Sequence, residues 1–192
     1  IKTGMLVNEA LVFVVVEFLE DHPGLPVVVD PVRIASAGGR LLDDAGWEVL
    51  RRRLLPMTTV LCPNAQEAGF LLGRPVRSLE DARRAVRELA GMGPEAIVLK
   101  GGHLESEEVV DLLWDGTRIH EFSGPRSVGF PVRGTGCIHS STLAGFLARG
   151  LPLVEAVSET ARTLCRAIDR SRAQGRSHVS FDSAEANHSL LC

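Results

Sequence analysis

The chain has 192 residues, of which 45% are hydrophobic and 23% charged, and its formal net charge is −3. These values are typical of one soluble globular domain. Because the basic residues form no stripe, nucleic acid and anionic membranes are poor candidate partners. The longest strongly apolar run, residues 10–16, is too short to span a bilayer. The four cysteines have no CxxC spacing, so we expect free thiols in a reducing cytoplasm rather than disulfides or a zinc site.

Short apolar runs alternate along the chain with helical patterns, which is typical of βαβ units around a parallel sheet. The predicted strands are the end of a strand within residues 1–6, then 27–29, 59–61 and 96–99. The predicted helices are 8–22, 43–55 with Pro56 as the stop, a short one through 66–71 with Gly73 as its C-cap, 78–92, 134–149 and 153–173. Because the chain opens on an apolar segment without a polar lead-in, we expect it to begin inside a fold whose first strands are missing.

The pattern changes after residue 99. Residues 109–114 and 119–122 flank the dipeptide Asp115-Gly116, which is a turn signal for a β-hairpin. We therefore expect an antiparallel hairpin at the edge of a mostly parallel sheet.

Four of the predicted strands end in polar, Gly-rich or Pro-bearing turns. These ends lie at Met5, Asp30, Asn64 with Glu67, and Lys100. Because ligands collect at the carboxyl ends of parallel strands, two acids and a base at this edge suit Mg²⁺ and polyphosphate. Taken singly, Asp30 and Glu67 could equally be turn and cap residues.

The segment Gly134-Thr135-Gly136-Cys137 precedes a long helix rich in small residues. The two glycines allow close backbone approach, and the free N–H groups of a helix start favour an anion. Such donors stabilise the charge on a phosphoryl group in transfer. The helix dipole is expected to favour the thiolate of Cys137. The alternatives are a plain tight turn and a small buried residue.

Three histidines show no partner in the sequence, and we expect them in loops or at the surface. They are His103, His139 and His178.

Four motifs occur together in a defined order. They are DPV at 30–32, PNAQE at 63–67, KGGH at 100–103 and GTGC at 134–137. In their order and approximate spacing they resemble the hydroxymethylpyrimidine/phosphomethylpyrimidine kinases of the ribokinase-like superfamily. The resemblance extends over nearly the whole chain, to about Ser177.

The resemblance implies an α/β, ribokinase-like three-layer αβα domain over residues 1–182, N-terminally incomplete, followed by a loose tail at 183–192. It implies a cytoplasmic, homodimeric enzyme of thiamine biosynthesis that uses ATP and Mg²⁺. The substrates would be hydroxymethylpyrimidine and its monophosphate.

The resemblance also implies roles for individual residues. Residues 134–137 would form the anion hole, with Cys137 as the catalytic base beside the substrate. The remaining roles are metal binding by Asp30 and Glu67, ATP binding by Lys100, Asn64 and Glu67, and pyrimidine binding by Met5 and Val32. Two alternatives remain open, a pyridoxal kinase of the same superfamily and a non-catalytic ligand-binding domain.

Overall fold

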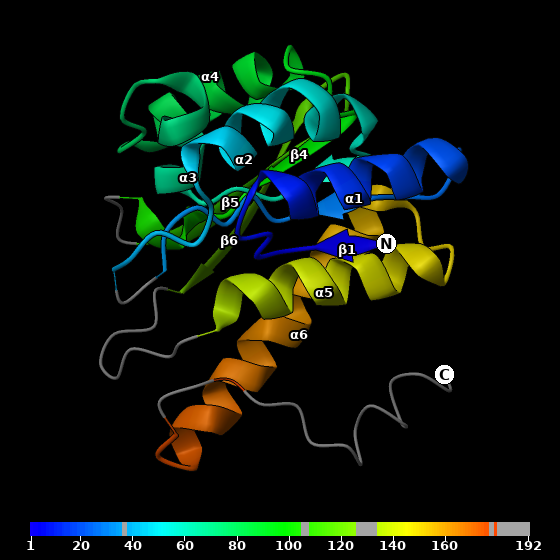
Figure 1. Cartoon of the computed structure of the whole chain (residues 1–192). Coiled ribbons are helices and arrows are strands. Elements are labelled where there is room, and N and C mark those ends of the chain that lie inside the picture. The colour runs from blue at the N-terminus through cyan, green and yellow to red at the C-terminus, as the bar shows by residue number, and fades with distance from the viewer. Residues whose placement is uncertain (36–37, 105–107, 126–133, 177–178, 180–192) are drawn as a thin grey trace.

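The computed structural model describes residues 1–35, 38–104, 108–125, 134–176 and 179 (Figure 1). Its centre is a six-stranded sheet with the strands in sequence order, β1-β2-β3-β4-β5-β6. The strands are β1 (Lys2–Thr3), β2 (Val28–Val29), β3 (Val60–Leu61), β4 (Ala96–Leu99), β5 (Glu108–Trp114) and β6 (Ile119–Pro125). β1 to β4 are parallel, whereas β5 and β6 run antiparallel. The predicted mixed sheet with an antiparallel edge hairpin is confirmed.

Helices cover both faces of the sheet and make the predicted three layers (Figure 1). The helices are α1 (Glu9–Asp21), α2 (Asp44–Val49), α3 (Ala65–Leu72), α4 (Leu79–Ala90), α5 (Thr135–Ala148) and α6 (Leu153–Ala173). α1 to α4 pack on one face, and α5 and α6 pack on the other. The last two helices therefore approach the sheet from the side opposite to the four helices that connect or flank its parallel strands.

Alternation along β2 and β3 explains why both strands are apolar throughout. Val29 and Leu61 belong to the core under α1 to α4, whereas Val28 and Val60 belong to the core under α5 and α6. Successive side chains of a strand point to opposite faces, so a strand covered on both sides has no polar position.

The predicted helix starts are confirmed by their capping hydrogen bonds. The side chain of Asn8 accepts a hydrogen bond from Leu11 N at 3.1 Å and begins α1. Ser78 and Asp81 form a capping box at the start of α4. At the end of α3, Gly73 is in the left-handed conformation with φ of 68°, which glycine adopts without steric cost.

The prediction that Pro56 stops the second helix is wrong, because the helical turns continue past it to Met57. After α2 the chain continues through a π-helical turn, Leu50–Leu54, and a 3-10 turn, Leu55–Met57. Pro56 lies at the start of this 3-10 turn, where the missing N–H costs no internal hydrogen bond.

The hairpin turn is built on Asp115. Its Oδ1 accepts hydrogen bonds from Thr117 N at 2.9 Å and Arg118 N at 2.8 Å, and Gly116 has φ of 94°. These bonds close the turn between the ends of β5 and β6, as the Asp-Gly signal predicts.

None of the described helices is long and apolar enough to cross a membrane. The predicted tail, residues 183–192, lies outside the described residues. The domain limits therefore stay a prediction.

The junction between β4 and β5 gives a matched pair of glycine substitutions. A Cβ on Gly101 would overlap the backbone carbonyl of Val110, whereas a Cβ on Gly102 would meet nothing within 4 Å. We expect Gly101→Ala to lower the free energy of unfolding by about 1–3 kcal/mol or more, because the clash is with backbone. Gly102→Ala should change it by less than about 0.5 kcal/mol. Urea unfolding of both variants measures the difference, and equal midpoints would contradict this packing.

Candidate active site

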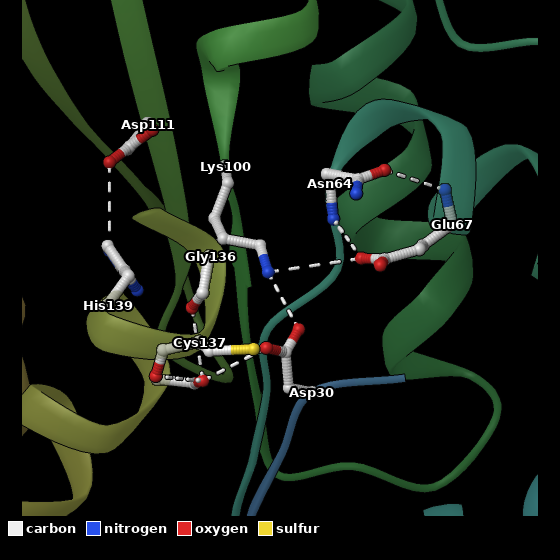
Figure 2. Close-up of polar contacts among 9 residues, drawn as sticks. Asp30, Asn64, Glu67, Lys100, Asp111, Gly136, Cys137 and His139 are labelled. Atoms are coloured by element: carbon white, nitrogen blue, oxygen red, sulfur yellow. Dashed lines mark hydrogen bonds and ion pairs between the residues drawn. The ribbon is translucent and has the colours of Figure 1, made fainter. Parts of the chain in front are cut away.

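The ends of β2 and β4 place a lysine and an aspartate in direct contact. Lys100 follows β4, and its Nζ donates to Oδ1 of Asp30, which follows β2, at 2.7 Å (Figure 2). Lys100 Nζ also lies 3.9 Å from Oε2 of Glu67 in α3. Parallel strands bring their carboxyl ends to one edge of a sheet, so residues 70 positions apart in sequence meet here.

This charge cluster is largely withdrawn from water. Asp30 is 2% exposed, Glu67 6%, and the Lys100 side chain 11%. Burial on its own lowers the pKa of Lys100, but Asp30 and Glu67 outweigh it and raise that pKa. Burial raises the pKa of Glu67 to about 7, although Lys100 opposes the shift. The lysine therefore stays charged, and Glu67 exchanges a proton near neutral pH.

Asn64 and Glu67 also have a local structural role. Asn64 Oδ1 accepts from Glu67 N at 2.9 Å, and Glu67 Oε2 accepts from Asn64 N at 2.7 Å. This reciprocal capping box begins α3 and fixes the Glu67 carboxyl beside Lys100. Glu67 can therefore cap α3 and belong to the charge cluster at the same time.

The first turn of α5 reaches the same cluster from the opposite face of the sheet. Gly134 precedes the helix with φ of 84°, and no described side chain caps this end. The Cβ position of Gly136 lies 3.4 Å from Lys100 Nζ, so this glycine lets the helix start come close to the lysine. Cys137 is exposed on the same turn.

Ser140 ties this helix turn to the aspartate, and sequence reasoning did not single it out. Its Oγ donates to Asp30 Oδ2 at 3.0 Å and also lies near the carbonyls of Gly136 (3.1 Å) and Cys137 (3.2 Å). The available signal was its spacing of four residues from Gly136, which places both on one face of a helix.

The structure thus brings most of the sequence-predicted residues together (Figure 2). The residues gathered here are Asp30, Asn64, Glu67, Lys100, Gly136 and Cys137, with Gly134 and Thr135 at the start of the same turn. Met5 and Val32 lie apart from this group of polar side chains, and Val32 is linked to it through its backbone. Met5 is 57% exposed at the end of β1, and the N–H of Val32 donates to the carbonyl of Asp30 at 2.8 Å.

The expectation of a surface or loop position is wrong for His139. It lies in α5 with 1% exposure, and its Nε2 is 3.7 Å from Oδ2 of Asp111 in β5. The helix is covered by the sheet on one side and by α6 on another, so a residue there can be buried without an obvious apolar stripe in the sequence. His103 adjoins the Lys100 turn, and His178 lies outside the described residues.

The donor set fits a magnesium ion that arrives with a nucleotide better than a permanent metal centre. The described residues contain no cluster of three or more histidine, cysteine or acidic side chains that could hold a metal ion. Mg²⁺ in phosphoryl-transfer sites uses one or two carboxylates, with phosphate oxygens and water as its other ligands. Asp30 and Glu67, which flank the Lys100 ammonium, are such a pair.

Comparison with known proteins decides the family. The sequence model of the phosphomethylpyrimidine kinase family matches residues 1–182. The chain belongs to this family. The phosphomethylpyrimidine kinase of Clostridium difficile is similar in structure, with a TM-score of 0.75 and 30% identity over 87% of this chain and 68% of that one. The fold is therefore ribokinase-like, as expected.

Several relatives carry names from thiamine biosynthesis or vitamin phosphorylation. The hydroxymethylpyrimidine/phosphomethylpyrimidine kinase of Aquifex aeolicus is 32% identical over 95% of this chain and 71% of its own length. The bifunctional protein ThiED of Geobacter sulfurreducens is 38% identical over 93% of this chain. The pyridoxal kinase of Staphylococcus aureus, solved with ADP, has a TM-score of 0.79 at 30% identity, over 87% of this chain and 61% of that one.

The chain spans only part of the relatives that it matches, 36% of the Geobacter protein and 71% of the Aquifex protein.

The buried Lys100–Asp30 pair leads to a stability prediction. Lys100→Met leaves the Asp30 carboxylate buried without its cation, and we expect a loss of about 3–5 kcal/mol in unfolding free energy near pH 7. Adding Asp30→Asn should restore part of that loss. As a matched control, Arg53→Met breaks the half-exposed Arg53–Glu20 pair and should cost no more than about 1 kcal/mol. Chemical denaturation of the parent chain and the three variants is the measurement, and equal losses in the two pairs would refute the buried-pair account.

The raised pKa of Glu67 predicts how stability depends on pH. The pKa is about 7 in the folded chain against 4.5 for the free side chain, so the folded chain binds this proton more tightly. The resulting stability is complete below pH 4.5 and is lost as the pH rises towards about 7. Across that range, without Mg²⁺, unfolding free energy should fall in the parent chain by up to about 3 kcal/mol relative to Glu67→Gln. If unfolding free energy depends on pH in the same way in both proteins, the pKa of Glu67 is not raised and the prediction is wrong.

Proposed function

We propose that this chain carries the nucleotide-phosphate site and catalytic turn of an ATP-dependent kinase of thiamine biosynthesis. Its substrates are hydroxymethylpyrimidine and the monophosphate formed from it. The observation that carries the proposal is the placement of Lys100 between two carboxylates and against Gly136 of the α5 turn. The names of the relatives from Aquifex and Clostridium support the same activity.

Lys100, Asp30 and Glu67 share the handling of the polyphosphate. Lys100 contacts phosphate oxygens of ATP, and Asn64 and Glu67 line the same edge. Asp30 and Glu67 would hold Mg²⁺, which would supply positive charge to neutralise the phosphates. Lys100 Nζ lies 2.7 Å from Asp30 Oδ1, and its flexible four-carbon stem would allow the ammonium to turn from the carboxylate to a phosphate.

The N-terminal turn of α5 orients the phosphoryl group while it is transferred. The backbone N–H groups of residues 134–137 are turned towards the start of the helix, where they favour negative charge. Positioning and electrostatic stabilisation account for most of the catalysis in phosphoryl transfer.

Cys137 is the base. Its thiolate takes the proton of the substrate hydroxymethyl group while the new oxygen–phosphorus bond forms and the bond to the leaving ADP oxygen breaks. The exposed position of Cys137 on the first turn gives a substrate access to the sulfur. Met5 and Val32 would contact the pyrimidine ring from the tips of the neighbouring strands.

A pyridoxal kinase is the second candidate, because pyridoxal kinases are among the solved structures similar to this chain. The two candidates share the phosphate chemistry and differ in the ring that is accepted. Cytoplasmic location and a homodimer remain predictions, the latter to be checked by light scattering.

The role of Cys137 predicts a kinetic defect without a structural one. We expect Cys137→Ala to lower kcat by about 100- to 10,000-fold, the usual contribution of a general base, with little change in the KM for ATP. Cys165→Ala, which removes another exposed cysteine from α6, is the matched control and should leave kcat unchanged. Full activity of Cys137→Ala would remove the cysteine as base.

The assay compares two substrates with Mg-ATP, hydroxymethylpyrimidine and pyridoxine. Phosphorylation of the pyrimidine at the higher kcat/KM supports the proposed function. Preference for pyridoxine supports the second candidate, and no turnover of either supports a non-catalytic domain.

A further inference from the structure

His139 and Asp111 form a buried pair that the proposed chemistry does not use. His139 is 1% exposed and the Asp111 side chain 14%, and their closest atoms, Nε2 and Oδ2, are 3.7 Å apart. Neither ring nitrogen of His139 has a hydrogen-bond partner among the described residues. Figure 2 shows the two side chains facing each other beside Lys100.

An unpaired buried imidazole costs folding free energy and calls for an explanation. Burial, and secondarily the charge of Lys100, lowers the pKa of His139 to about 3, so the ring is neutral. A leucine would fill a similar volume without two unsatisfied nitrogens. Buried polar groups that break the rules of core packing are expected at functional sites.

The two residues attach to opposite sides of the proposed phosphate site. Asp111 accepts a hydrogen bond from Gly101 N through Oδ1 at 2.7 Å, so it holds the turn that directly follows Lys100. His139 lies two residues after Cys137 and directly before Ser140, at the start of the second turn of α5. A hydrogen bond between them would join the lysine turn to the helix start.

We propose that His139 is a positioning residue that docks the first turn of α5 on Asp111 when a phosphate occupies that turn. The distance of 3.7 Å is slightly longer than a hydrogen bond. Hydrogen bonds of this kind are often long in ligand-free sites and tighten in the complex. A shift of the helix start towards β5 by about 0.5–1 Å closes the gap.

This inference rests on the proposed function, because it assumes that the α5 turn receives a phosphate. Together with Ser140, which contacts Asp30, the docked His139 fixes the helix turn at two points on either side of Lys100. The backbone N–H groups of the turn then stay directed at the phosphoryl group during transfer. Misplacement of reacting groups by about 1 Å costs about 100-fold in rate, so the second point of attachment is expected to affect kcat.

The first test separates positioning from stability by kinetics in the full chain. We expect His139→Leu to lower kcat by about 10- to 100-fold while the Tm stays the same or rises, because the buried unpaired nitrogens are gone. His139→Gln keeps an N–H donor and should recover part of kcat. Unchanged kcat in His139→Leu overturns the proposal. If the Tm of His139→Leu is lower than that of the parent chain, His139→Gln becomes the deciding variant. A kcat of His139→Gln as low as that of His139→Leu would then also overturn the proposal.

The second test reads the contact itself and does not depend on turnover. In ¹⁵N-histidine NMR spectra, adding the non-hydrolysable nucleotide AMP-PCP with Mg²⁺ should shift the Nε2 resonance of His139. Asp111→Asn keeps an acceptor for Gly101 N but changes the group that faces His139, so it should abolish or alter that shift. The same Nε2 response in both proteins would overturn the proposal.

The outcomes distinguish this inference from the proposed function. An inactive parent chain contradicts the proposed function, whatever the His139 variants do. An active parent chain with a fully active His139→Leu variant contradicts the positioning role alone.

Discussion

The buried ion pair between Lys100 and Asp30 is the constraint on which the site depends. The two side chains meet at 2.7 Å with Asp30 only 2% exposed, and they come from the tips of β4 and β2. Removing both charges from water is costly, so the pair is stable only with good geometry and further hydrogen bonds. Ser140 supplies one such bond from α5. A single contact thus links two strand tips with a helix of the opposite layer.

The same constraint makes the site ready for an exchange of partners. The ammonium of Lys100 pairs with Asp30 and reduces the cost of burying Glu67 beside it. In the proposed function, a phosphate would pair with Lys100 and a divalent ion would pair with Asp30 and Glu67. This exchange would leave none of the three buried charges without a partner.

Sequence patterns predicted the parts of this structure that local rules and parallel pairing determine. Asp30 and Lys100 follow continuous apolar runs, and parallel register obliges the ends of such strands to meet. Asn8 and Ser78 fix helix starts through bonds to residues three positions away. Contacts between layers were not predictable in this way. Ser140 is bonded to Asp30 across 110 positions, and nothing local indicates which face of a helix rich in small residues turns inward.

His139 illustrates what such inter-layer contacts add. α5 meets the sheet through two polar side chains in succession, Ser140 against Asp30 and His139 facing Asp111, and these carboxylates lie on either side of Lys100. An apolar interface would hold the helix at least as firmly, but it would allow the helix start to slide, because apolar contacts have no preferred direction. Directional contacts cost stability when unpaired and restrict orientation when paired. Their concentration beside the α5 turn, where Gly136 approaches Lys100, argues that these side chains serve the orientation of this turn rather than the stability of the core.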